Sequence, residues 1–390
     1  PVYTAAGNAG EREALLRRAE KDGKGVIITS YDLLRRDVLL YEKVSFACEV
    51  IDEAQFIKNH ATQASRAVKQ ITADFRLALT GTPVENRLSE LWSIFDFLMP
   101  GFLFSYSRFR EELETPIVTG REEETAARLL RMIRPFVLRR LKKDVLTDLP
   151  DKIEKHMVAV LEGEQSSLYD AHVQRLLAIL SKQTEQEFAG AQIQVLAELT
   201  KLRQICCDPG LLFDGYEGDS AKTRLCMELI RNAAEGGHKI LLFSQFTSML
   251  ELLAKRLDEA GVSHFTLQGS TPKPVRAELV RRFNSGEADV FLISLRAGGT
   301  GLNLTAADIV IHYDPWWNVA AQNQATDRAY RIGQRNPVQV YKLIAQDTIE
   351  EKIVELQQAK QDLAETVTGS ADGAILSMKP EELLQLLQEE

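Results

Sequence analysis

Short hydrophobic runs alternate with helix-forming segments over the second half of the chain. Each run is four residues long, and the runs begin at Ile240, His264, Val290, Ile309 and Val338. This alternation predicts strands joined by helices, which is typical of a parallel sheet. An earlier run at residues 156–160 predicts the strand that opens this domain. The second half is therefore expected to form one nearly complete α/β domain.

The N-terminal part shows the same rhythm with fewer strands. Residues 26–29 predict a strand, and a helix follows from Ser30, which suits the N-cap position. Residues 46–51 predict a mostly buried strand, residues 61–71 a helix, and residues 75–79 the next strand. A strand, helix and strand in this order predict parallel pairing with a right-handed crossover.

Three segments break this rhythm. Residues 88–131 have helical periodicity and predict a protrusion whose phenylalanines form its own core: Phe95, Phe97, Phe102, Phe104 and Phe109. Residues 131–143 carry six basic side chains around Pro135, which predicts a bend, and a solvated surface stripe is one interpretation of them. Residues 165–207 predict further helices.

Composition narrows the class of protein. The chain has 390 residues, of which 45% are hydrophobic, so it can bury two cores. We expect no membrane span, no signal peptide and a cytoplasmic location, with reduced and mostly buried thiols at Cys48, Cys206, Cys207 and Cys226. A net charge of −9 predicts that any groove for nucleic acid is a local patch on an acidic body.

Two charged clusters suggest phosphate chemistry. Asp52 and Glu53 follow the strand at residues 46–51, and ligands of parallel α/β sheets bind at the carboxyl ends of strands. There Asp52 would hold Mg²⁺ and Glu53 would polarise an attacking water. Arg328 and Arg331 lie three residues apart in a predicted helix, so both guanidinium groups would project from one face and clamp a transferring phosphoryl group. A solvated basic turn is the alternative.

Two loops between the later strands have small side chains suited to binding phosphate. Gly269, Ser270 and Thr271 offer free backbone N–H groups that grip a phosphate without reading a base. The loop from Ser294 to Gly301 contains three glycines within four residues, which allow the backbone to approach a phosphate closely.

Taken in order and spacing, four segments resemble the motifs of the Swi/Snf-type DNA translocases, relatives of the superfamily-two helicases. They are DEAQ at 52–55, LTGTPVEN at 79–86, RAGGTGLNL at 296–304 and NQATDRAYRIGQ at 323–334. The resemblance covers nearly the whole chain. It implies an α/β fold with two RecA-like lobes, ATP and Mg²⁺ as cofactors, and double-stranded DNA as partner. DNA-bound protein complexes are a further expected partner.

The resemblance also implies roles for individual residues. Those expected at the nucleotide are Asp52, Glu53, Gln55, Gly299, Gly301, Gln324, Arg328 and Arg331. Those expected to couple the nucleotide site to the DNA site are Thr80, Gly81 and Thr82. Those expected at the DNA are Ser30, Gly269, Ser270, Thr271 and Arg296. The resemblance also implies that the basic residues at 131–143 act as a brace between the lobes or face DNA.

The expected domains follow from these motifs. They are the C-terminal part of the first lobe (1–87), the helical protrusion (88–131), the basic interlobe connection (132–152), the start of the second lobe with a helical insertion (153–220), the second lobe proper (221–346) and a brace helix with an acidic tail (347–390).

One motif of a working ATPase is missing from the sequence. A glycine-rich loop ending in Gly-Lys-Ser or Gly-Lys-Thr holds the nucleotide phosphates, and the nearest string here is Gly23-Lys24-Gly25. We therefore expect that the N-terminal part of the first lobe has been removed or lies on another polypeptide, and that this piece alone does not hydrolyse ATP. A non-catalytic DNA-binding scaffold and an RNA-directed helicase remain alternatives. The acid motif with the short tail resembles bacterial members, which implies the nucleoid; a eukaryotic member would be nuclear.

Overall fold

The computed structural model describes residues 1–366 apart from 82–87, 121, 139, 141, 147, 182–184, 217, 219 and 299–300. The side chains of 143–144, 185–192, 296, 298 and 359–366 are also outside the described part. The chain forms two compact units, whose main parts are Pro1–Leu138 and Arg139–Gln361. In the described residues no helix is long and apolar enough to cross a membrane.

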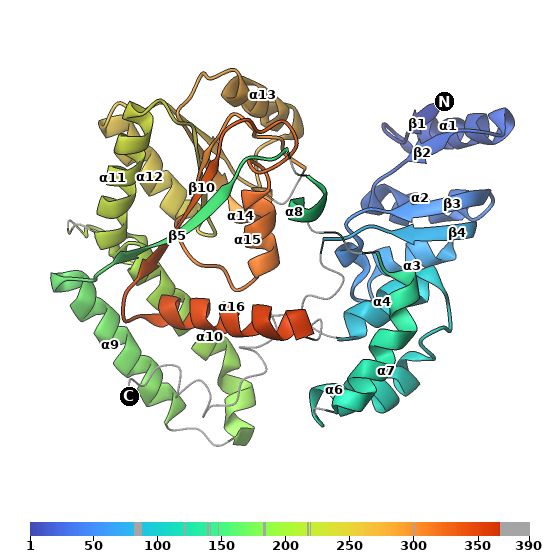
Figure 1. Cartoon of the computed structure of the whole chain (residues 1–390), viewed down its shortest axis with the longest axis horizontal. Helices are drawn as coiled ribbons and strands as arrows, with labels where there is room; N and C mark the ends of the chain where they lie inside the picture. Colours follow the sequence, from blue (N-terminus) through green and yellow to red (C-terminus); the bar gives the residue numbers. More distant parts are fainter. Residues whose placement is uncertain are drawn as a thin grey trace. The chain divides into compact units, whose positions relative to one another are not determined.

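A six-stranded parallel sheet forms the centre of the second unit (Figure 1). Its strands are β5 (Lys152–Ala159), β6 (Ile240–Ser244), β7 (His264–Leu267), β8 (Val290–Ser294), β9 (Ile309–His312) and β10 (Val338–Ala345). Their order is β5-β10-β9-β6-β8-β7, and every neighbouring pair is parallel. The six predicted strands and their parallel pairing are confirmed.

Both faces of this sheet are covered, and its strands β6, β8 and β9 are buried at every position. Leu241 and Phe243 face one hydrophobic core, which α13 (Lys273–Asn284), α14 (Leu295–Gly298) and α15 (Val319–Thr326) help to build. Ile240 and Leu242 face the other core, beneath α11 (Ala221–Glu235) and α12 (Thr247–Glu259). A strand buried on both faces reads as an unbroken hydrophobic run, which explains why these strands could be predicted.

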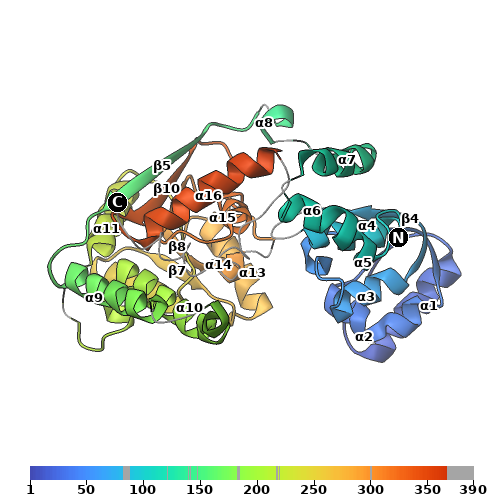
Figure 2. The same ribbon diagram turned by 90° about the horizontal axis from the view of Figure 1, so that it is seen from below.

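A helical layer packs on the edge of the second unit beside β5 and β10. Helices α9 (Gly163–Leu180) and α10 (Glu185–Cys207) pack against each other, and the short η4 (Pro209–Leu211) follows (Figure 2). Ile349 and Ile353 of α16 (Ile349–Thr366) are buried in the same core as Leu202 and Ile205. The helices predicted at residues 165–207, and a helix in the segment 347–390, are confirmed in the described part.

The first unit holds two small sheets. The strands β1 (Val2–Thr4) and β2 (Val26–Ile28) pair in one, and β3 (Ser45–Ile51) and β4 (Thr72–Ala78) in the other, both in parallel. The helices among them are α1 (Ala9–Asp22), α2 (Tyr31–Tyr41), η1 (Ala54–Ile57) and α3 (Gln63–Gln70). The predicted β3-α3-β4 unit is confirmed.

The prediction that the β3 strand is mostly buried is wrong. On one face of the β3–β4 pair, Val50, Phe75 and Leu77 are 52%, 58% and 41% exposed. The hydrophobic core of this unit contacts Ile51 and Ala78, which lie on the opposite face. An apolar run in the sequence predicts a strand. It does not predict whether other elements cover one face of that strand or both.

The segment after β4 is helical as predicted. It contains α4 (Leu88–Leu98), α5 (Tyr106–Phe109), the π-helical η2 (Arg110–Glu114), α6 (Thr115–Val118), α7 (Glu123–Ile133) and η3 (Arg134–Phe136). Phe95 and Phe109 are buried in its own core, and Phe102 and Phe104 are half-buried against that core. Phe97 was wrongly assigned to this core, because it is buried with Ile51 in the core of the β3–β4 region. The phenylalanines therefore pack as core residues.

Three of the four cysteines are buried, as expected, and Cys48 is exposed.

Candidate functional site

The acid pair lies at the carboxyl end of β3, and its backbone is unusual. Glu53 adopts φ 50° and ψ 56°, the left-handed region that a residue other than glycine rarely occupies. Backbone bonds on either side hold it there, because Leu79 N–H donates to Ile51 O (2.8 Å) and Ala54 N–H donates to Leu79 O (2.9 Å). Strained backbone of this kind concentrates at functional sites. Sequence reasoning gave no sign of this conformation.

A chain of side-chain hydrogen bonds links Glu53 to the end of β4. The Gln55 amide donates to Glu53 Oε2 (2.7 Å), and the Thr80 hydroxyl donates to Gln55 Oε1 (3.0 Å). Asp52 Oδ1 accepts from the Glu53 N–H (2.9 Å). Four predicted site residues from two motifs are therefore brought together at one edge of the sheet. Gly81 follows at the same place and is exposed, whereas Thr82 is outside the described residues.

Tyr31 and Ser30 lie at the start of α2, close to this edge. The Tyr31 hydroxyl donates to the Asp52 carbonyl (2.8 Å), and burial, with Asp52 nearby, raises the Tyr31 pKa well above its usual range. Ser30 is the N-cap of α2, and its hydroxyl accepts from the Leu33 N–H (3.3 Å). Capping accounts for Ser30 in the structure, and its contact with DNA stays a prediction. Tyr31 was not predicted as a site residue.

In the second unit, the predicted site loops follow β7, β8 and β9. The strands are parallel, so these loops share the carboxyl edge of the sheet, where α/β proteins bind ligands. After β7, Thr271 closes a turn: its hydroxyl accepts from the Gln268 N–H (3.0 Å) and its own N–H donates to Gln268 O (3.1 Å). Gly269 and Ser270 are left exposed at the tip of that turn.

The glycine-rich loop after β8 meets the arginine segment. Gly301 is exposed with φ +29°, and the space where a Cβ would lie is open to 4 Å. Its neighbour Leu302 accepts a hydrogen bond at its carbonyl from Arg331 Nη1 (3.1 Å). Gly299 and the Arg296 side chain are outside the described residues, although the Arg296 backbone lies in α14.

The prediction that the two arginines lie on one helix is wrong. Helix α15 ends at Thr326, and Arg328 and Arg331 lie in the turns that follow. The Gln334 amide explains this, because it donates to Ala307 O (2.7 Å) and Ala329 O (3.2 Å) and so holds the segment in a turn. Such tertiary contacts override helix propensity.

Burial differs between the residues of this segment. Arg328 is buried, at 8% exposure, and its carbonyl accepts from the Leu304 N–H (3.0 Å). Arg331 is half-buried, and Gln324 is half-buried on α15. The two arginines therefore share one short segment without sharing a helical face.

His312, at the carboxyl end of β9, was not singled out from the sequence. It is fully buried, stacks on Phe243, and its Nε2 lies 2.8 Å from Thr326 Oγ1 at the end of α15. Burial lowers the His312 pKa to about 3, so the ring is neutral at physiological pH. The bond ties the end of β9 to the start of the arginine turns. A histidine ending a buried strand is the signal that sequence reasoning passed over.

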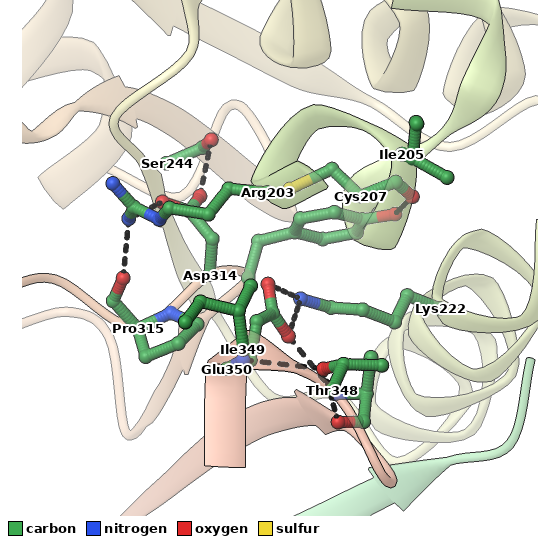
Figure 3. A network of polar contacts seen from close by, with 12 residues as sticks. Arg203, Ile205, Cys207, Lys222, Ser244, Asp314, Pro315, Thr348, Ile349 and Glu350 are labelled. Carbon is green, nitrogen blue, oxygen red and sulfur yellow. Dashed lines mark hydrogen bonds and ion pairs between the residues drawn. The ribbon is translucent and has the colours of Figure 1, made fainter. Parts of the chain in front are cut away.

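A buried polar network fixes the loop between β9 and α15 (Figure 3). Asp314 accepts from the Ser244 hydroxyl (2.5 Å), and Arg203 Nη2 donates to the Pro315 carbonyl (2.6 Å). Below them, Lys222 Nζ lies 2.8 Å from both carboxylate oxygens of Glu350. The network joins α10, α11, β6 and the start of α16 to this loop.

The tryptophans of the same loop pack inside the second unit. Trp316 packs against the core that lies on the α13 face of the sheet, and Trp317 packs against the helical layer. The Arg203 guanidinium lies 5.5 Å from the Trp317 ring centroid. Both rings are therefore held by packing within the second unit.

The residues present fit a Mg²⁺ ion that has few protein ligands and keeps several waters. Among the described residues no group of three or more His, Cys, Asp or Glu side chains has metal-binding geometry. Mg²⁺ commonly keeps several waters and binds through one or two carboxylates together with substrate phosphates. Asp52 is exposed and offers such a carboxylate.

Comparison with known proteins places both units. Residues 221–333 match the family model of the helicase conserved C-terminal domain, which makes the second unit a helicase-type α/β domain. Residues 1–211 match the SNF2-related domain. The chain belongs to the SNF2 family, and the SNF2-related match extends across the division between the two units after Leu138.

Related proteins and structures agree. A putative ATP-dependent helicase/translocase of Bacillus subtilis, YwqA, is 39% identical over 94% of this chain and 40% of its own length. Human TATA-binding protein-associated factor 172 is 34% identical over 93% of this chain and 23% of its own length. The SWI2/SNF2 ATPase core of Sulfolobus solfataricus, solved in complex with double-stranded DNA, is 34% identical with a TM-score of 0.52, covering 100% of this chain and 86% of that one. The chain thus spans less than half of these curated relatives.

Proposed function

We propose that the protein containing this chain couples ATP hydrolysis to movement along double-stranded DNA. Membership of the SNF2 family supports ATP as the nucleotide. The related archaeal core was solved with double-stranded DNA, which supports DNA as the partner. DNA-bound protein complexes are proposed as further partners, because one relative is named as a TATA-binding protein-associated factor.

The observation that carries this proposal is the hydrogen-bonded chain from Glu53 through Gln55 to Thr80. In the proposed site Asp52 would hold Mg²⁺, which would neutralise charge on the phosphates, and Glu53 would accept a proton from the attacking water. The Gln55 amide orients the Glu53 carboxylate. Because Gln55 also accepts from Thr80, a change at the Thr80–Gly81–Thr82 segment would reach the carboxylate through two hydrogen bonds.

The arginine turns are assigned to the charge that develops on the transferred phosphoryl group. Among the described residues, Arg331 bonds through one guanidinium nitrogen, to the Leu302 carbonyl, and we assign the rest of its fork to a ligand. Arg328 is more buried and supports the same turn. Gly299, Gly301 and Gln324 are assigned to nucleotide contacts near these arginines.

The DNA contacts are assigned to residues that recognise phosphate and not bases. Gly269 and Ser270 are exposed at the turn after β7, and Thr271 rigidifies that turn. Arg296 and Ser30 complete the proposed set. Contacts of this kind bind the DNA backbone in any sequence, as a translocating protein requires.

The test measures phosphate release by the full-length protein with duplex DNA, single-stranded DNA or RNA, beside this chain alone. We expect turnover stimulated most by duplex DNA, and none from this chain, since its sequence contains no Gly-Lys-Ser/Thr phosphate loop. Absence of turnover by the full-length protein would favour the scaffold alternative. Stronger stimulation by RNA would overturn the DNA assignment.

A further inference from the structure

The segment that opens the second unit contacts the turn that carries the arginines. The division between the units falls after Leu138, and Lys142 begins the short helix α8 (Lys142–Val145). Lys142 Nζ lies 2.6 Å from Asp327 Oδ1 and donates to the Tyr330 carbonyl at 3.3 Å. It also lies 5.9 Å from the centroid of the Tyr330 ring.

The two residues that Lys142 contacts lie on either side of Arg328, and the second of them is next to Arg331. Asp327 is the C-cap residue of α15 and directly precedes Arg328, while Tyr330 directly precedes Arg331. One ammonium group therefore fixes both ends of a four-residue turn. Lys142 is the single described residue of the basic connection, 132–152, that contacts Asp327 and the Tyr330 backbone together.

The contact has little value for stability alone. The Lys142 and Asp327 side chains are each 40% exposed, and ion pairs so open to water contribute little to folding. The contact would instead matter for the position of the arginine turn, because a small displacement of a group that acts on a reacting phosphoryl can slow the reaction substantially. Gln334 and Leu304 also bind the backbone of the turn, at the Ala329 and Arg328 carbonyls.

We propose that Lys142 is a positioning residue that holds the turn bearing Arg328 and Arg331 and links that turn to the segment joining the two units. The proposal rests on the proposed function of these arginines. A pull on the connecting segment would then act on Asp327 and Tyr330 through Lys142. This assigns Lys142 to the arginines and not to a DNA phosphate.

The first test is hydrogen exchange, which does not depend on turnover. In Lys142→Met, the amides of Tyr330, Gln334 and Leu304, all hydrogen-bonded within or to the turn, should exchange about two- to fivefold faster. Arg282→Met is the matched control, since Arg282 pairs with Glu287 at similar exposures of 40% and 44% and lies over the Phe265 ring. It should leave these amides unchanged. Unchanged exchange in Lys142→Met would overturn the proposal.

The second test is turnover by the full-length protein at saturating DNA. Lys142→Met should lower kcat about two- to fivefold with little change in KM for ATP, and Lys142→Arg should restore most of it. Asp327→Asn should have the same effect, and the double variant should be no slower than either single one. Wild-type kcat in Lys142→Met, with weaker DNA binding instead, would show a phosphate contact and overturn the proposal. If the wild-type protein lacked turnover, the proposed function would fail, while the exchange result would still decide on Lys142.

Discussion

The Lys222 ammonium lies 2.8 Å from both carboxylate oxygens of Glu350, and solvent reaches neither side chain. The pair joins α11 to the first turn of α16, where Glu350 also accepts from the Ala345 N–H (2.9 Å). The Lys222 ammonium further lies 5.1 Å from the Tyr313 ring, next to the loop that leads to α15. The pair therefore secures α16 against α11 and the end of β10.

Breaking this pair should destabilise the second unit strongly. Lys222→Met leaves the Glu350 carboxylate buried without its cation, so the free energy of unfolding should fall by about 3–5 kcal/mol, measured by chemical denaturation. The double variant Lys222→Met with Glu350→Leu removes both charges and should recover most of that loss. If the double variant were as unstable as the sum of both single variants, the pair would not be coupled.

Removing the charge of Glu53 should separate nucleotide binding from turnover. Glu53→Gln keeps the shape of the side chain and its contact with Gln55 but removes the proton acceptor, so phosphate release by the full-length protein should fall about 10²- to 10⁴-fold. Nucleotide affinity, measured by fluorescence titration, should stay close to that of the wild type. Substantial remaining turnover would remove Glu53 from the role of base.

The link between Thr80 and Gln55 should affect the response to DNA. Thr80→Val removes the hydroxyl that donates to Gln55 Oε1 while keeping the side-chain volume. One lost hydrogen bond corresponds to roughly 1 kcal/mol, so the ratio of DNA-stimulated to basal turnover should fall about fivefold. Thr80→Ser restores the donor and should restore the ratio. An unchanged ratio in Thr80→Val would exclude this link as the coupling route.

The sequence predicted some parts of the site and missed others for identifiable physical reasons. The strands of the second unit could be predicted because Leu242 and Leu292 lie in runs buried on both faces. The position of the acid pair at a strand end also followed from the run that precedes it. The left-handed backbone of Glu53 could not be predicted, because it depends on hydrogen bonds made by Leu79 and Ala54 across the sheet.

The arginine turns show the same limit. Residues 319–331 contain good helix formers and no proline, so a helix through Arg331 was the reasonable prediction. The turn instead depends on Gln334, whose amide reaches three carbonyls at long sequence distance or across the turn. The role of Lys142 was likewise open, since partners 185 or more residues away cannot be read from local pattern.

Arg331 should matter more for hydrolysis than for DNA binding. Arg331→Ala removes both the proposed phosphoryl contact and the bond to the Leu302 carbonyl, and turnover should fall by about 10³-fold if the guanidinium acts on the transition state. DNA affinity, measured by anisotropy at fixed salt, should change little. Arg331→Lys keeps a donor for Leu302 but not the planar fork, so it should remain slow. Equal loss of turnover and DNA binding would indicate a structural role.

Glu49 should make the stability of the first unit depend on pH. Its Oε2 lies 3.4 Å from Arg76 Nε, but the two atoms are not aligned for a hydrogen bond, and burial raises the Glu49 pKa to about 7. The folded state therefore holds a proton that the unfolded chain releases near the usual pKa of 4.5. Stability should fall as pH rises from about 4.5 to about 7 and then level off.

Thermal melting of this chain between pH 5 and pH 8 tests that expectation. Glu49→Gln should flatten the decline of Tm with pH because it removes the group that titrates. Glu154→Gln is the control: Lys152 and Lys342 each lie 2.7 Å from Glu154 and lower its pKa to about 2, so its contribution is lost only as pH falls below 4.5. The control should leave the slope between pH 5 and pH 8 unchanged. A slope that persists in Glu49→Gln would assign the titration to another group.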